Sequence, residues 1–227
     1  PLPYLDAVEA YSKREDKERI TALRSGEVDM IENMSYFDAP DFEANEADKY
    51  NIFKSPQVGT SHFNLQAKSG PMAMSGGEDA KLLRQAVAHA IDKQGVHEAV
   101  FNGLGEPLDT FYASGSPWHL DGVKPGPEYD PEKTRFILRK LNLENFPIAV
   151  VSRQAYQYMR NSAEIVHAML LEAGFNATNE VFDNPVLQAK YEKDDYGLDS
   201  TASSFRFDPD GHYGRWILSL IHISEPT

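Results

Sequence analysis

Strands and helices alternate along the second half of the chain, and no other feature of the sequence constrains its fold so strongly. Asp130-Pro131 begins a helix, with Asp as the cap and Pro in the first turn, where its missing N–H costs no hydrogen bond. Gly174 follows a later amphipathic segment at the position of a helix end. The expected elements are, in chain order, a helix from 130 to 141, a strand at 148–151, a helix at 156–173, a strand at 177–182, a short helix at 186–192 and a strand at 198–203. Alternating elements with short links predict an α/β sandwich architecture.

The first half of the chain contains the same kinds of element in a less regular order. Residues 4–12 and 28–34 have the apolar pattern of short strands. Asp16 and Gly26 are the start and end signals of a helix between them, so the opening has the strand–helix–strand order that builds parallel sheets. The other expected elements are a short helix at 42–48, strands at 52–55 and 61–67, a helix over 82–91, a second helix capped by Asp92 and ended by Gly103 and Gly105, and a Pro- and Gly-rich loop at 104–129.

The composition excludes several classes of function. The chain of 227 residues carries a formal net charge of −13, which repels phosphate backbones, and no basic stripe with interleaved aromatic residues offsets it, so no nucleic-acid partner is expected. The absence of cysteine rules out disulfides, thiolate metal sites and a cysteine nucleophile. None of the seven histidines shows the i, i+4 spacing of a metal site, so neither a metal nor another cofactor is expected. No apolar run is long enough to cross a bilayer.

Five stretches of sequence carry a resemblance to a known family. They are PYLDAVEAYSKREDKERITALRSGEVDMIENM (3–34), KLLRQAVAHAIDKQGVHEAVFNGLGEP (81–107), YDPEKTRFILRKL (129–141), AEIVHAMLLEAGFNATNEVFD (163–183) and SFRFDPDGHY (204–213). They are spread over residues 3–213, in the order found in the dipeptide-, oligopeptide- and nickel-binding family (family 5) of ABC importer solute-binding proteins. The chain resembles a part of such a protein.

The resemblance implies a fold and a division of the chain. Family members have two α/β lobes of the type II periplasmic-binding-protein kind, joined by hinge strands, and they are considerably longer than this chain. We therefore expect an incomplete version of that fold. Residues 1–67 are expected to belong to the first lobe and residues 68–217 to the second.

The resemblance also implies a function without chemistry. The expected protein is not an enzyme; it captures a peptide-like or other small solute outside the cytoplasm by lobe closure and delivers it to ABC permease subunits. A periplasmic or extracellular location, with membrane association through the permease or a lipid anchor, follows from the resemblance alone. Because the family's proteins are longer, we expect weak or no ligand binding by residues 1–227 on their own.

Arg153 is the first candidate for ligand binding. It follows the strand at 148–151 and precedes the next helix, so it is expected at the carboxyl end of a strand, where open α/β sheets place ligands. A guanidinium beside a helix N-terminus suits a carboxylate partner. On the residues alone, a solvated loop arginine is an equal alternative. The resemblance favours binding, since an arginine in this turn pairs with the ligand's carboxylate in the dipeptide-binding branch.

The loop around Asp208-Pro209-Asp210 departs from the dipeptide-binding pattern. In that branch an Asp three positions before the motif receives the ligand's free amine, but Phe205 stands there in this chain, with Arg206 beside it. The resemblance then implies a ligand without a free amine at that end, such as an anionic or aromatic solute. Asp208 remains a candidate polar group in the cleft, while a simple tight turn is the alternative for both aspartates.

Two other function classes remain open. A hydrolytic enzyme with paired carboxylates would use either Asp208 with Asp210 or Glu180 with Asp183, although no nucleophile or phosphate-binding motif accompanies them. A chemosensory binding adaptor would differ only in its downstream partner. Trp118 and Tyr112 are candidates for stacking on a ligand, or for packing their own loop.

The C-terminal residues 218–227 read LSLIHISEPT and continue no earlier pattern. The string resembles the in-frame translation of a transposon adapter used in preparing sequencing libraries, so it is expected to be non-native. A native apolar strand at 218–223 is the alternative.

Overall fold

The computed structural model describes residues 4–13, 15–54, 59–110, 112, 114, 116–122 and 126–204. The elements within these ranges are α1 (Asp16–Arg24), α2 (Asp38–Glu46), β1 (Gly59–Leu65), the 3-10 turn η1 (Gly70–Met72), α3 (Gly77–His89), α4 (Lys93–Phe101), α5 (Pro131–Lys140), β2 (Pro147–Arg153), α6 (Gln157–Glu172), β3 (Asn176–Phe182), α7 (Asn184–Glu192) and β4 (Leu198–Ser204).

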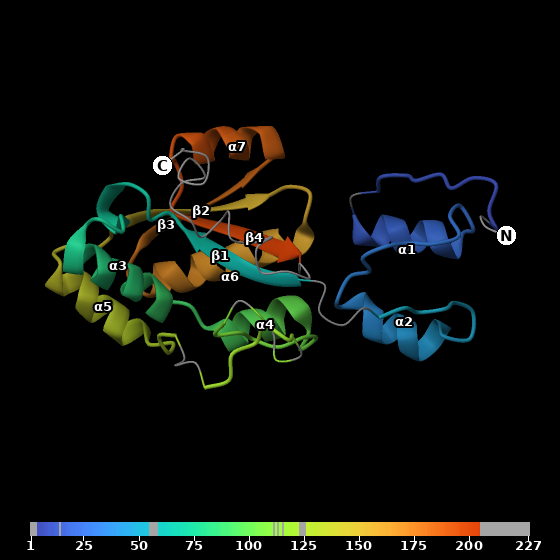
Figure 1. Cartoon of the computed structure of the whole chain (residues 1–227), viewed down its shortest axis with the longest axis horizontal. Coiled ribbons are helices and arrows are strands. Elements are labelled where there is room, and N and C mark those ends of the chain that lie inside the picture. Colours follow the sequence, from blue (N-terminus) through green and yellow to red (C-terminus); the bar gives the residue numbers. More distant parts are fainter. Residues whose placement is uncertain are drawn as a thin grey trace, which may run out of the picture.

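The four strands form one mixed sheet in the order β1-β4-β2-β3 (Figure 1). β2 is parallel to both β3 and β4, and only the edge strand β1 runs antiparallel to its neighbour β4. The carboxyl ends of β2, β3 and β4 therefore lie at the same edge of the sheet. In the register, Val151 of β2 is beside Asp199 of β4.

Helices cover both faces of this sheet. Ile148, Val150 and Leu198 belong to the apolar core that also contains Ala163 and Val166 of α6. Because side chains alternate along a strand, Arg153 and Asp199 point to the opposite face. There Arg153 meets Tyr191 of α7, so α6 and α7 lie on opposite faces, as Figure 1 shows. α3 and α5 extend the core, and the buried Thr134 hydroxyl donates to the Ala86 carbonyl at 2.9 Å between them.

The predicted elements of the second half are confirmed, with ends that differ by a few residues. Asp130 caps α5, because its carboxylate accepts from the Lys133 N–H at 2.9 Å. Gly174 has a φ of 98° after α6, in the left-handed region that glycine tolerates. Asp92 occupies the cap position of α4 but its side chain makes no capping hydrogen bond.

The strands predicted at 4–12, 28–34 and 52–55 are wrong as far as these residues are described. The helix between the first two forms, although Asp16 is its first residue rather than its cap. The flanking segments have no ladder partner among the described residues, and several of their apolar side chains are exposed, as Val8 at 79% and Met30 at 79% show. Apolar alternation makes a strand only where a neighbouring strand accepts its backbone hydrogen bonds.

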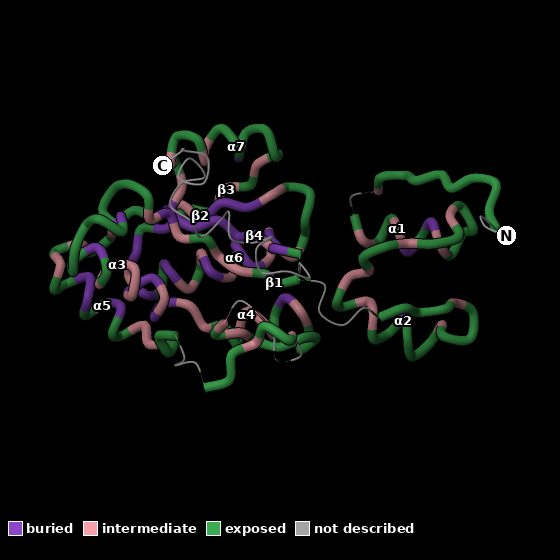
Figure 2. The backbone as a smooth tube through the Cα atoms, in the orientation of Figure 1, coloured by how far each residue is buried: buried purple, intermediate pink, exposed green. Residues whose placement is uncertain are grey.

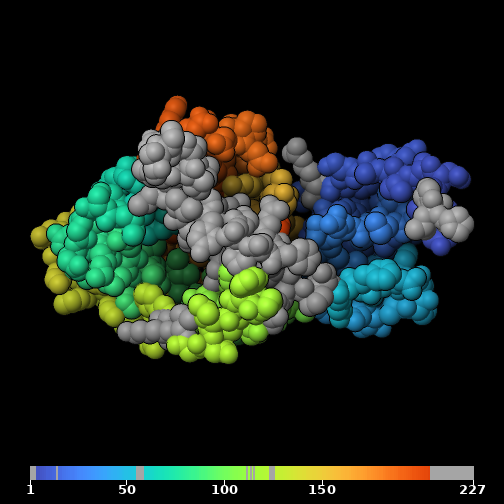
Figure 3. Space-filling view, in the orientation of Figure 1, coloured from blue at the N-terminus to red at the C-terminus, as the bar shows by residue number. Residues whose placement is uncertain are grey.

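The N-terminal segment, residues 15–54, lies beyond the carboxyl edge of the sheet (Figure 1, Figure 3). It is mostly exposed, whereas buried residues concentrate in the sheet and its helices (Figure 2). It contacts the rest through aromatic rings and through an ion pair. The Tyr36 ring lies 5.2 Å from that of Phe101 and 6.5 Å from that of Tyr158, both edge-on, and Arg160 Nη2 lies 4.0 Å from Glu15 Oε1. The division after residue 67 remains a prediction; β1, which precedes it, is hydrogen-bonded to β4.

The packing at the start of β4 can be tested by a substitution at Gly197, the residue before the strand. A Cβ there would lie 2.5 Å from Ile148 Cγ1 and 3.0 Å from the Ala149 carbonyl oxygen. We expect Gly197→Ala to lower the free energy of unfolding by about 1–3 kcal/mol, because β2 must shift to relieve the overlap. Urea unfolding followed by circular dichroism measures this.

Gly126→Ala is the matched control, since a Cβ there meets only Asp109 Oδ1, at 3.6 Å. Its effect is expected within about 0.5 kcal/mol of zero. Equal effects of the two substitutions would contradict the packing of β4 against β2.

Candidate functional site

The candidate site lies at the carboxyl edge of the parallel strands. Arg153 is the last residue of β2, and the chain turns there into α6 through a hydrogen bond from the Tyr156 N–H to the Arg153 carbonyl at 3.3 Å. The position of Arg153 at a strand's carboxyl end is therefore as predicted. Its role in ligand binding stays a prediction.

Three side chains hold the Arg153 guanidinium. Nη1 donates to Asp199 Oδ1 at 3.3 Å and to Thr201 Oγ1 at 3.0 Å, and Nη2 donates to the Tyr191 hydroxyl at 2.7 Å. Asp199 and Thr201 are two residues apart on β4 and so project from the same face of the sheet. The alternative of a freely solvated loop arginine is thus excluded by the structure.

Asp199 is the buried charge of this group, with a side chain only 3% exposed. Burial raises the pKa of its carboxyl above the ordinary value of 3.8. The hydrogen bond with Tyr191 and the charges of Arg153 and His62 act in the opposite direction. The desolvation of the carboxylate outweighs its partners, as happens when a charge is taken out of water.

Tyr191 closes the group from α7. Burial raises the pKa of its phenol, and a hydrogen bond of the hydroxyl to Asp199 raises that pKa further. The hydroxyl therefore donates to Asp199 and accepts from Arg153, which forms a closed triangle of hydrogen bonds. Neither Tyr191 nor Asp199 is among the site residues predicted from the sequence. The available signal was a lone acidic residue among the small, mostly hydroxyl-bearing side chains of the strand Leu198–Ser204.

Tyrosine rings adjoin Arg153 on the side of the N-terminal segment. Tyr156, in the turn after Arg153, is 45% exposed, and its ring lies 6.0 Å from that of Tyr158. Burial raises the pKa of Tyr158 to about 12, with Arg153 acting in the opposite direction. Tyr158 in turn contacts Tyr36 and Phe101. An arginine with aromatic neighbours at a sheet edge suits a solute that has both an anionic group and an apolar part.

The other predicted site residues are not brought together by the described structure. Phe205, Arg206 and Asp208, with Asp210, lie outside the described residues. Glu180, a candidate acid–base residue with Asp183, is ion-paired with Lys190 at 3.5 Å. In the loop of Tyr112 and Trp118, the Tyr112 carbonyl accepts from the Thr110 hydroxyl at 2.8 Å, and the Trp118 side chain is 46% exposed.

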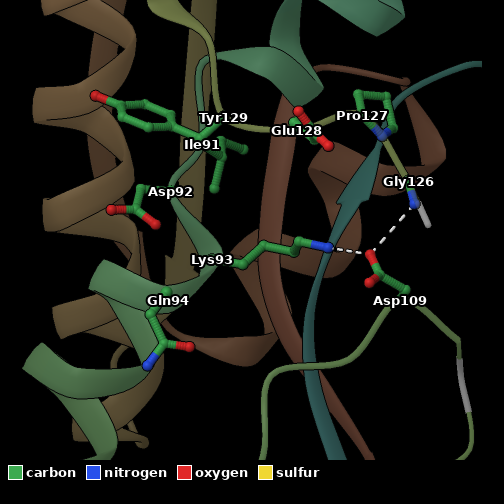
Figure 4. A pocket seen from close by; sticks show the side chains of 9 residues that line it. All are labelled: Ile91, Asp92, Lys93, Gln94, Asp109, Gly126, Pro127, Glu128 and Tyr129. Atoms are coloured by element: carbon green, nitrogen blue, oxygen red, sulfur yellow. Dashed lines mark hydrogen bonds and ion pairs between the residues drawn. The ribbon is translucent and has the colours of Figure 1, made fainter.

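A separate hollow of about 220 Å³ lies between the start of α4 and residues 126–129 (Figure 4). Its central charges are already matched, because Lys93 is ion-paired with Asp109, which also accepts from the Gly126 N–H at 3.2 Å. Among the described residues, no three His, Asp or Glu side chains are grouped as a metal site would require. No helix in the described part of the chain is long and apolar enough to cross a membrane.

Solved structures show the class of this fold. The chain is similar to the periplasmic binding protein DppA from Helicobacter pylori in complex with the peptide STSA, with a TM-score of 0.73, 18% identity, and coverage of 86% of this chain and 36% of that one. It is also similar to NikA from Brucella suis in complex with Fe(III)-EDTA, with a TM-score of 0.71, 20% identity, and coverage of 87% and 42%. The fold is thus that of a type II periplasmic binding protein, of which this chain holds a part.

The family follows from the sequence comparison. Residues 1–220 match the model of the bacterial extracellular solute-binding proteins, family 5, middle region, and the chain belongs to that family. A curated relative from Brucella ovis, named as a candidate ABC transporter peptide-binding protein, is 24% identical over 193 residues, covering 82% of this chain and 33% of its own length. The chain therefore spans about a third of the curated relatives it matches.

The raised pKa of Asp199 has a measurable consequence. Because the folded protein binds this proton more readily than the unfolded chain, its contribution to the free energy of unfolding is most favourable at low pH. The contribution falls as the pH rises from 3.8 through the folded pKa. We expect a carboxyl ¹³C titration by NMR to place the Asp199 midpoint above 3.8.

A midpoint for Asp199 at or below 3.8 would mean that the partners, not burial, dominate its electrostatics.

Proposed function

We propose that the chain is the part of an ABC importer's solute-binding component that recognises a carboxylate on the solute, with no chemical step. The solute would be captured outside the cytoplasm between the two lobes, then delivered to permease subunits at the membrane. The observation that carries the proposal is the hydrogen bonding of Arg153 at the carboxyl edge of the sheet. Three side chains hold its guanidinium, and some of its N–H groups have no partner among the described residues.

The donors of Arg153 can be counted. A guanidinium has five N–H groups. Two on Nη1 and one on Nη2 are used by the described residues, which leaves Nε–H and the second Nη2–H without a partner among them. Because the Tyr191 hydroxyl is also bonded to Asp199, the partner of Nη1, it takes the Nη2 hydrogen that faces Nη1. The two remaining hydrogens then lie on one edge of the planar group, the geometry that binds a carboxylate in two parallel hydrogen bonds.

Family membership and the ligands named with similar structures support this reading. The peptide STSA bound to DppA and the EDTA of the complex bound to NikA both carry carboxylates. We further propose that residues 15–54 belong to the first lobe and meet the second lobe through Tyr36, so that the solute enters between Arg153 and the N-terminal segment. Phe205, Arg206 and Asp208, which follow β4 in the sequence, stay predicted ligand-binding residues.

A peptide pair tests the carboxylate requirement. The tetrapeptide Ser-Thr-Ser-Ala and its C-terminal amide differ only at the group that Arg153 would bind. We expect the free acid to shift the Arg153 Nε–Hε signal in ¹H–¹⁵N NMR, with a dissociation constant on the order of 1 mM, because only part of the binding protein is present. The amide should bind at least about tenfold more weakly, since it loses charge-assisted hydrogen bonds.

Arg153→Ala should abolish the preference for the free acid. Arg139→Ala, which removes an exposed arginine at the end of α5, should preserve it. Equal binding of acid and amide by the unsubstituted chain would refute carboxylate recognition at this site.

A further inference from the structure

We propose that Asp199 and Tyr191 are positioning residues that lock the Arg153 guanidinium so that its Nε–H and one Nη2–H face the solute as a fixed pair. This inference rests on the proposed function, in which Arg153 forms a carboxylate clamp through two parallel hydrogen bonds. It adds an explanation of how that clamp is made selective. The role of Asp199 and Tyr191 is exerted through Arg153 and requires no contact with the solute.

The lock is built from two elements on either side of the guanidinium. Asp199 and Thr201 come from the buried strand β4, and their hydrogen bonds occupy both hydrogens of Nη1. Tyr191 comes from α7 and occupies one hydrogen of Nη2. Anchors on two nitrogens fix both the plane of the group and its rotation about the Nε–Cζ bond, so the remaining edge has one orientation.

The anchors themselves are rigid. Asp199 is 2% exposed and Thr201 is 5% exposed. Asp199 is beside Val151 in the β2–β4 register, two residues before Arg153, so the strand ladder sets its distance from the arginine. The ring of Tyr191 is packed edge-on against that of Tyr196, at 5.3 Å between centroids. A pre-formed group loses less conformational entropy when a solute binds.

Asp199 also sets the charge of the clamp. With Asp199 ionised, the pair with Arg153 has no net charge, so a carboxylate gains hydrogen bonds of defined geometry and little long-range attraction. A buried Arg–Asp pair is weak evidence for stability, because the desolvation of both charges offsets their attraction. In this proposal the buried Arg153–Asp199 pair serves to select a planar anion rather than to stabilise the fold.

Two conservative variants test the lock. Tyr191→Phe keeps the ring and removes one anchor, and Asp199→Asn keeps the shape and removes the compensating charge. Tyr196→Phe is the matched control, because its hydroxyl makes no hydrogen bond to the Arg153 guanidinium. Circular dichroism confirms that each variant is folded.

The first readout needs no solute. We expect slow rotation of the Arg153 guanidinium in the unsubstituted chain, seen as separate Nη signals in ¹⁵N NMR, and faster rotation in Tyr191→Phe and Asp199→Asn. Tyr196→Phe should leave the rotation unchanged. Unchanged rotation in both test variants would overturn the proposal, whatever the solute results.

The second readout is the binding of Ser-Thr-Ser-Ala. Tyr191→Phe should weaken it by about three- to tenfold, the loss expected for one orienting hydrogen bond. Asp199→Asn leaves Arg153 with an uncompensated charge, so binding should become markedly more sensitive to salt between 20 and about 200 mM, which the neutral pair resists.

The two hypotheses fail separately. If the peptide binds through Arg153 but neither variant changes rotation, affinity or salt dependence, the positioning role is refuted and the proposed function stands. If the variants release the guanidinium but the unsubstituted chain binds acid and amide equally, the proposed function is refuted and the lock remains as a structural finding.

Discussion

The pairing of β4 with β2 is the interaction on which the candidate site depends. It inserts the last strand of the described chain between β1 and β2, although some forty-five residues of sequence separate β2 from β4. The parallel register brings Asp199 beside Val151 and so within reach of Arg153. Without this ladder, the arginine at the end of β2 would have no buried partner, and its charge would be solvated like that of any loop arginine.

Because of this register, the two faces of the sheet have different roles. The face toward α6 carries Ile148, Val150 and Leu198 and supplies the apolar core that stabilises the fold. The face toward α7 carries a charged and hydroxyl-bearing group at the same level of the sheet. A single-residue shift of β4 would exchange these faces, placing Asp199 in the apolar core. The core and the site therefore enforce the same register.

The site also shows how a buried ion pair can be retained without contributing much stability. Burial raises the pKa of Asp199 despite its contacts with Arg153 and Tyr191, so desolvation dominates. Such a group is a local cost to folding, and its proposed role is to hold the guanidinium while two of its hydrogens have no partner among the described residues. The tyrosines at positions 36, 156 and 158 give the arginine a partly apolar border on the side of the N-terminal segment.

The sequence by itself determined the helices and strands from Asp130 onward, because helix-capping residues, glycines and apolar periodicity act over a few neighbouring residues. It also placed Arg153 at the end of a strand, and its motifs indicated the family. It was wrong about strands at 4–12 and 28–34, since alternation is local while a ladder needs a partner elsewhere in the chain. Asp199, Thr201 and Tyr191 could not be linked to Arg153 from the sequence for the same reason. Only the strand order β1-β4-β2-β3 and the packing of α7 decided that they meet, because the hydrogen bonds that join them connect residues 38 to 48 positions apart.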